Sequence, residues 1–106
     1  QKKSEAICNA LDKYFGSSAE YKKPDGGIFV WVDMHKKVDT SRLYELALKD
    51  GVAINPGNEW SINKSGRHKM RLCFGNPSIK EIDEGIKRLA IICRKEFGIP
   101  TKIANL

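Results

Sequence analysis

Apolar residues recur every three or four positions in three stretches of the chain, a spacing that places side chains on one face of a helix. The pattern predicts helices over residues 4–15, 40–50 and 78–97. The expected core faces are Ile7, Leu11, Tyr14 and Phe15 in the first helix, Leu43, Leu46 and Ala47 in the second, and Ile79, Ile82, Ile86, Leu89, Ala90, Cys93 and Phe97 in the third.

Residues that favour helix ends flank all three stretches. The expected N-terminal caps are Ser4, then Asp39 or Thr40, then Ser78 in a capping box with Glu81; the expected C-terminal glycines are Gly16, Gly51 and Gly98. A capping side chain accepts hydrogen bonds from the first free backbone N–H groups, and glycine adopts the left-handed exit without a steric cost. The boundaries of the three helices are therefore predicted as well.

Three shorter apolar segments predict strands, at 28–32, 52–54 and 70–74. The first is an unbroken run, so we expect it to be buried on both faces, with Trp31 packed in the core. In 70–74, alternation places Met70, Leu72 and Phe74 on one face of the strand and leaves Arg71 and Cys73 on the other face. The segment 16–27, which contains a Pro-Asp-Gly-Gly turn, is expected to lack regular structure.

The predicted order is helix, strand, helix, strand, strand, helix, and three helices most simply cover one face of such a small sheet. The length of 106 residues suits one domain, and 41% hydrophobic with 30% charged residues excludes a disordered chain. No apolar stretch approaches the roughly 20 residues of a membrane span. The chain opens on Gln1 without an initiator Met, so we expect a fragment of a longer protein.

The cysteines, Cys8, Cys73 and Cys93, are scattered and form no Cys-x-x-Cys pair. This spacing predicts neither a zinc site nor a disulfide framework. Reduced thiols, mostly buried, are the simpler interpretation, and they fit a cytoplasmic protein.

The positive charge of the chain suggests nucleic-acid binding as one possible function. The net charge is +6, and half of this excess lies in residues 51–75, around the basic loop 64–69. Such a cluster attracts nucleic acid, and the nearby Trp60 could stack on a base, although a short basic run is more often a solvated loop. His35 and His68 also lie in loops, and a catalytic role for either requires an orienting carboxylate that the sequence does not place.

Arg71 is the strongest candidate for a binding residue. It lies in the middle of a predicted strand and points away from the helix-covered core. A guanidinium stays charged and offers a planar fork of donors to a carboxylate. From spacing alone, an ordinary arginine on a solvated sheet face is the more common situation.

Four motifs together resemble the carboxy-terminal small domain of class I/II, fold type I pyridoxal-phosphate (PLP) aminotransferases. They are residues 24–32 (PDGGIFVWV), similar to P-x-G-G-x-F-x-W-V; 51–60 (GVAINPGNEW), similar to G-V-x-x-x-P-G-x-x-F with Trp60 in place of the usual Phe; 70–74 (MRLCF), similar to R-L-x-F; and 82–89 (IDEGIKRL), similar to I-x-E-G-I-x-R-L. The branch that it resembles most contains 2-aminoadipate and aromatic aminotransferases and the aminotransferase-like half of MocR/GntR-type regulators.

The resemblance implies an α+β fold: a small, mostly antiparallel sheet of three or four strands with helices packed on one face. It implies that Arg71 binds the α-carboxylate of amino-acid and 2-oxo-acid substrates while the domain closes the active site. The Schiff-base lysine and the other PLP-binding groups would belong to a missing large domain, so no catalytic, cofactor-binding or metal-binding residue is expected in 1–106. Family enzymes build their sites across a homodimer.

Three functions therefore stay open. The first is the small domain of a transaminase, which would be inactive on its own. The second is a sensor domain of a transcription regulator, marked by a helix-turn-helix upstream of the large domain. The third, a free-standing basic nucleic-acid-binding module, is the weakest, because the basic cluster is modest.

Overall fold

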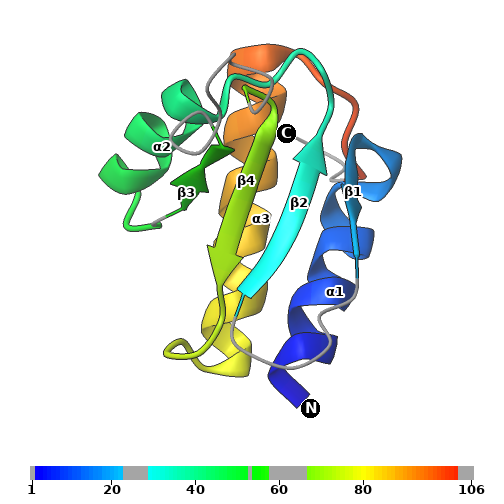
Figure 1. The fold of residues 1–106 in the computed structure, drawn as a ribbon, viewed down its shortest axis with the longest axis vertical. Coiled ribbons are helices and arrows are strands. Elements are labelled where there is room, and N and C mark those ends of the chain that lie inside the picture. The colour runs from blue at the N-terminus through cyan, green and yellow to red at the C-terminus, as the bar shows by residue number, and fades with distance from the viewer. Residues whose placement is uncertain (1, 23–28, 53, 58–66, 103–106) are drawn as a thin grey trace.

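The computed structural model describes residues 2–22, 29–52, 54–57 and 67–102. Their elements are α1 (Lys2–Tyr14), the short 3₁₀ helix η1 (Gly16–Ser18), β1 (Ala19–Tyr21), β2 (Phe29–Met34), α2 (Thr40–Lys49), β3 (Asn55–Pro56), β4 (Lys69–Cys73) and α3 (Ile79–Phe97). The four strands form one sheet in the order β1-β2-β4-β3, and every neighbouring pair is antiparallel. Figure 1 shows α1 and α3 side by side behind this sheet, with α2 beyond the β3 edge. The predicted α+β class is confirmed.

The core lies between the sheet and the helices. In β4, Met70 and Leu72 are buried together with Phe74, which follows the strand. The buried residues of β2 are Val30, Val32 and Met34, and those of α3 are Ile82, Ile86, Leu89, Ala90 and Cys93. Burial that alternates along both central strands means that one sheet face holds the core and the other lies open.

Most of the predicted helix ends are confirmed. The side chain of Asp39 accepts a 3.0 Å hydrogen bond from the backbone N–H of Ser41, at the start of α2. Ser78 and Glu81 form the expected capping box of α3, and Gly98 ends that helix in the left-handed region, with φ of 67°. These local signals succeed because each satisfies backbone groups that the helix leaves unpaired.

The prediction for the start of the first helix is wrong. Helix α1 already includes Lys2, so Ser4 lies inside it and is buried instead of capping it. Ile79, expected on the core face of α3, is 47% exposed. It is the first residue of α3, and the buried residues of that helix begin one turn later, at Ile82.

Two strand predictions are also wrong. The segment expected to lack regular structure contains η1 and β1, and among the described strands β1 pairs with β2 alone, at the edge of the sheet. The expected strand 52–54 is displaced, because pairing with β4 involves Asn55 and Pro56. Pro56 lacks a backbone donor and is tolerated because β3 is at the edge of the sheet. Both strands are short, and their pairing partners define them more than their own sequence does.

The central strand β2 is not buried on both faces, as its unbroken apolar run had suggested. Val30 and Val32 are buried, whereas Phe29 is 37% exposed and Trp31 is 54% exposed. The expected core position of Trp31 is therefore wrong. The two rings lie on the open face, and their positions there determine the surroundings of Arg71.

Candidate functional site

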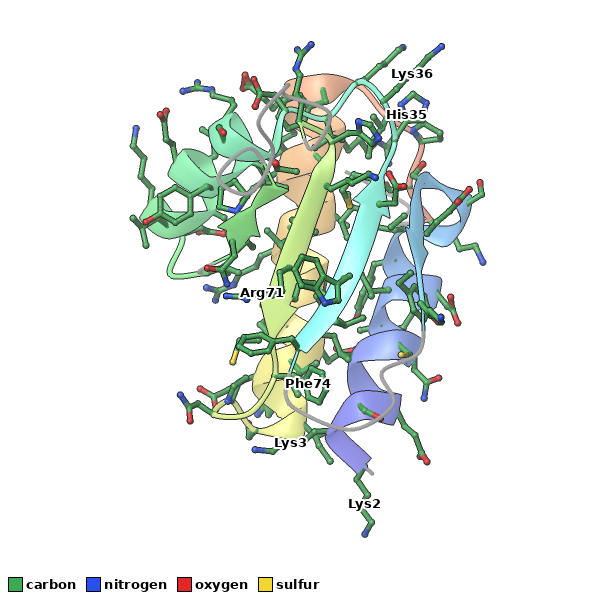
Figure 2. The ribbon with its side chains drawn as sticks, viewed as in Figure 1. Lys2, Lys3, His35, Lys36, Arg71 and Phe74 are labelled. Carbon is green, nitrogen blue, oxygen red and sulfur yellow. The ribbon has the colours of Figure 1, made fainter. Side chains whose placement is uncertain are left out.

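Arg71 projects from β4 onto the open face of the sheet. Its neighbours in the chain, Met70 and Leu72, are buried against the helices, so the pleat directs Arg71 to the opposite side. Figure 2 shows the labelled Arg71 on the side of the sheet that faces the viewer, away from α3. This agrees with the direction that the strand pattern predicted.

Two aromatic rings from β2 hold the Arg71 guanidinium. Its central carbon lies 4.1 Å from the centroid of the Phe29 ring and 5.7 Å from that of Trp31. The strand register explains this arrangement, because Trp31 is directly opposite Arg71 and Phe29 lies two residues earlier on the same face. Both distances fall within the range of cation–π attraction.

Arg71 differs from other arginines of the described chain in having no counter-charge there. Arg42 pairs with Glu45 and Glu96, and Arg88 pairs with Glu84. In the part of the chain that the structure describes, Arg71 contacts no carboxylate within 4 Å, and its Nε is buried without a hydrogen-bond partner. A buried donor without a partner is uncommon and costly in native proteins.

This arrangement leaves the Arg71 cation able to accept an anion on the open face. The rings stabilise the positive charge of the guanidinium without occupying its hydrogen-bond donors. Of the three guanidinium nitrogens, Nε is the one that is buried without a hydrogen-bond partner among the described residues. The terminal amino groups of Arg71 can donate two parallel hydrogen bonds to one carboxylate. Cys73 lies exposed on the same face, two residues along β4.

The structure also supplies a carboxylate for His68, which sequence reasoning did not find. His68 Nε2 lies 3.1 Å from Oδ1 of Asp33, which belongs to β2 and faces the open side. The clue in the sequence was the alternation that places Asp33 on the same face as Trp31. In the sheet register, Asp33 pairs with Lys69, one residue after His68 and two before Arg71. His35 instead accepts a 3.1 Å hydrogen bond at Nδ1 from the backbone N–H of Lys37.

The basic loop 64–69 is described only from residue 67 onward, and Trp60 also lies outside the described residues. Nε of Arg67 lies 3.8 Å from Oδ2 of Asp39, and both side chains are substantially exposed. Its backbone carbonyl accepts hydrogen bonds from the backbone N–H and the hydroxyl of Thr40. Within the described residues, this end of the loop thus contributes to the start of α2.

The sequence predicted neither a metal site nor a disulfide. Among the described residues, no three His, Cys, Asp or Glu side chains form a group suited to a metal ion. Cys8, Cys73 and Cys93 are free thiols, and burial raises the pKa of Cys93 to about 12. None of the described helices has the length and apolar character needed to cross a membrane.

Comparison with known sequences gives a consistent set of relatives, although no family model matches the chain. It is 38% identical over 98 residues to an uncharacterized aminotransferase of Saccharolobus solfataricus, covering 92% of this chain and 24% of that protein. It is 34% identical to aromatic-amino-acid aminotransferase 1 of Thermococcus litoralis, covering 88% and 22%. An uncharacterized HTH-type transcriptional regulator of Bacillus subtilis is 30% identical, with coverage of 90% and 19%. The chain thus spans about a quarter or less of these relatives.

Solved structures share the fold over nearly the whole chain. The multiple substrate aminotransferase of Thermococcus profundus superposes with a TM-score of 0.82 and 33% identity, covering 92% of this chain and 24% of its own. The α-aminoadipate aminotransferase of Thermus thermophilus, complexed with N-(5'-phosphopyridoxyl)-L-leucine, gives a TM-score of 0.79 and 31% identity, with coverage of 89% and 24%. In sequence and in fold, the chain therefore matches about a quarter of the length of known aminotransferases, and the match is consistent with the carboxy-terminal domain of the fold type I enzymes.

Proposed function

We propose that this chain is the substrate-orienting small domain of a PLP-dependent aminotransferase, in which Arg71 binds the α-carboxylate of amino-acid and 2-oxo-acid substrates. The observation that carries the proposal is the Arg71 guanidinium on the open sheet face, charged and without a carboxylate among the described residues. Two hydrogen bonds from one planar group would fix both the position and the orientation of the carboxylate.

The residues around Arg71 fit a substrate carboxylate better than the cofactor. The described groups beside it are two aromatic rings and, farther along the strand, a thiol. Lys69 also lies on this face, two residues before Arg71 and opposite Asp33, but the resemblance to the family places the Schiff-base lysine in the large domain. We therefore assign PLP to the remainder of the longer protein and no step of its chemistry to this chain. When bound there, PLP would act as the electron sink for transamination.

The remaining parts of the proposal concern the whole protein. We assign to it a large domain in the same polypeptide, a homodimeric assembly and a place in cytoplasmic amino-acid metabolism. The small domain would close over the bound substrate, so its contribution is orientation and exclusion of water. The isolated chain would not catalyse transamination.

The test uses the full-length protein with Arg71→Ala and Arg71→Lys. We expect Arg71→Ala to lower kcat/KM for amino acids by about a hundredfold or more, because two charge-assisted hydrogen bonds are lost. Arg71→Lys keeps the charge but loses the planar fork, so it should fall between the wild type and Arg71→Ala. The control is Lys69→Ala, which removes an exposed cation from the same face of β4. An unchanged kcat/KM in Arg71→Ala would refute the role.

A second candidate is a sensor domain of a transcription regulator, favoured by the 30% identity to the Bacillus subtilis regulator. Arg71 would then bind the carboxylate of an effector instead of a substrate. The size of the native gene product separates the two. A polypeptide about four times the length of this chain fits the aminotransferase, since the chain spans 24% of the Saccharolobus relative. A product about five times as long that binds DNA through an upstream domain fits the regulator, of which the chain spans 19%.

A further inference from the structure

We infer that Phe29 and Trp31 are positioning residues that hold the Arg71 guanidinium ready for a carboxylate; this inference rests on the proposed function. The two residues lie on β2 and Arg71 on β4, so the contact joins the two central strands of the sheet. Phe29 makes the closer approach, 4.1 Å from its ring centroid to the guanidinium carbon, against 5.7 Å for Trp31.

Arginine on an open sheet face would ordinarily sample many rotamers. Its long side chain loses considerable conformational entropy when a ligand fixes it, which weakens binding. Contact with two rings supplies this ordering before the ligand arrives. The buried, unpaired Nε indicates that the side chain is already ordered, because packing has removed this atom from water without supplying a hydrogen bond.

The choice of rings also keeps the charge available. A carboxylate beside Arg71 would hold it equally well, but that carboxylate would compete with the ligand for the same N–H donors. The faces of Phe29 and Trp31 attract the cation through their quadrupole and leave those donors free. Because Nε is enclosed, the terminal amino groups remain for the carboxylate, which must then approach end-on.

Ordinary packing is the competing explanation for the two rings. Phe29 is 37% exposed and Trp31 is 54% exposed, so neither ring fills the core. The valines that do, Val30 and Val32, alternate with them on the other face of β2. Replacing a ring by leucine keeps an apolar side chain but removes the π face, which separates positioning from packing.

The experiment measures carboxylate discrimination in the full-length protein. The probes are the twenty common L-amino acids and the α-amide of the fastest one, and the readout is the ratio of kcat/KM for that acid to kcat/KM for its amide. We expect Phe29→Leu to lower this ratio about tenfold and Trp31→Leu about threefold, in line with their distances. Phe29→Tyr, which restores a ring, should return the ratio to within about twofold of the wild type.

The matched control is Leu48→Ala, which shortens an exposed apolar side chain on helix α2, outside the sheet that carries Arg71. It should leave the ratio unchanged. If Arg71→Ala lowers the ratio while Phe29→Leu and Trp31→Leu leave it intact, the positioning role is wrong and the proposed function stands. If Arg71→Ala itself leaves the ratio intact, the proposed function fails and the positioning role fails with it. Equal losses of kcat/KM for acid and amide in Phe29→Leu would indicate packing alone.

Discussion

The hydroxyl of Tyr14, the last residue of α1, donates a 2.8 Å hydrogen bond to Oδ2 of Asp83 in α3. The ring is buried, and the pKa of Tyr14 is raised, first by that burial and then by the hydrogen bond to Asp83. Lys13 lies 3.9 Å from the other oxygen of the same carboxylate. The two helices that back the sheet are therefore joined by a polar contact as well as by their apolar faces.

Removing this hydrogen bond should weaken the fold by a modest amount. We expect Tyr14→Phe, which keeps the ring, to lower the free energy of unfolding by about 1 kcal/mol, the usual net contribution of a hydrogen bond. Tyr44→Phe is the control, because the Tyr44 hydroxyl has no hydrogen bond to the described residues, and it should change stability by less than about 0.5 kcal/mol. Urea unfolding of both variants checks the difference, and equal effects would contradict it.

The thiols should react in the order that their surroundings dictate. Burial raises the pKa of Cys93 to about 12, and the thiolate is the reactive form, so Cys93 should stay unmodified by iodoacetamide in the folded protein at pH 8. Cys73 is exposed on the open face and should react first. Mass spectrometry of the modified protein tests this order. Equal labelling of Cys73 and Cys93 without denaturant would show that the core is packed differently.

The raised pKa of Cys93 also sets an alkaline limit on stability. The thiol of the unfolded chain ionises near its ordinary pKa of 9, whereas the folded one stays protonated up to about 12. The unfolded state therefore releases its proton first, and the free energy of unfolding should fall as the pH rises through this interval. Cys93→Ala should lessen the fall between pH 9 and 11, and an identical slope would contradict the assignment.

The sequence predicts most reliably the features that depend on neighbouring residues. The caps act on backbone groups of their own helix: Asp39 and Ser78 accept hydrogen bonds at a helix start, and Gly98 ends α3 in the left-handed region. Their roles could therefore be predicted from nearby residues. The inward and outward faces of the strand around Arg71 followed from alternation alone. The fold class followed from these elements together with the family motifs.

The sequence predictions are wrong where the structure depends on contacts between distant parts of the chain. Strand β1 forms by pairing with the edge of β2, and the three residues of β1 contain no pattern that indicates this partner. Trp31 was assigned to the core because its run is unbroken, but covering only one face of the sheet leaves every second residue of β2 outside. The aromatic contacts of Arg71 and the pairing of His68 with Asp33 both cross between strands, so they required the register.

The capping box of α3 should make stability depend on pH in the acid range. Hydrogen bonds from Ser78, first from its backbone and then from its side chain, lower the pKa of Glu81 below its ordinary value of 4.5. A lowered folded-state pKa contributes stability that is present above that ordinary value and is lost as the pH falls through the folded one. Glu81→Gln should therefore lose less stability than the wild type between pH 5 and pH 3, as followed by thermal unfolding.

Ser78→Ala distinguishes the two hydrogen bonds of this box. It removes the hydroxyl but keeps the backbone N–H, which donates to Glu81 at 2.9 Å. We expect it to cost about 1 kcal/mol at neutral pH, as the loss of a helix cap does. Most of the acid dependence should remain, since the backbone is the larger cause of the Glu81 shift. Loss of that dependence in Ser78→Ala would assign it to the hydroxyl instead.

Gly85 inside α3 and Gly98, which ends that helix, should respond to alanine in opposite directions. Gly98 has a φ of 67°, and an added Cβ would meet no atom of the described residues within 4 Å. The cost of Gly98→Ala is therefore that of placing an L-residue in the left-handed region, about 1–2 kcal/mol. Gly85 lies inside α3 with equal space and ordinary helical geometry. Gly85→Ala should therefore stabilise the protein by roughly 0.5–1 kcal/mol through helix propensity. Chemical denaturation compares the pair directly, and shifts of the same sign would mean that α3 does not end at Phe97.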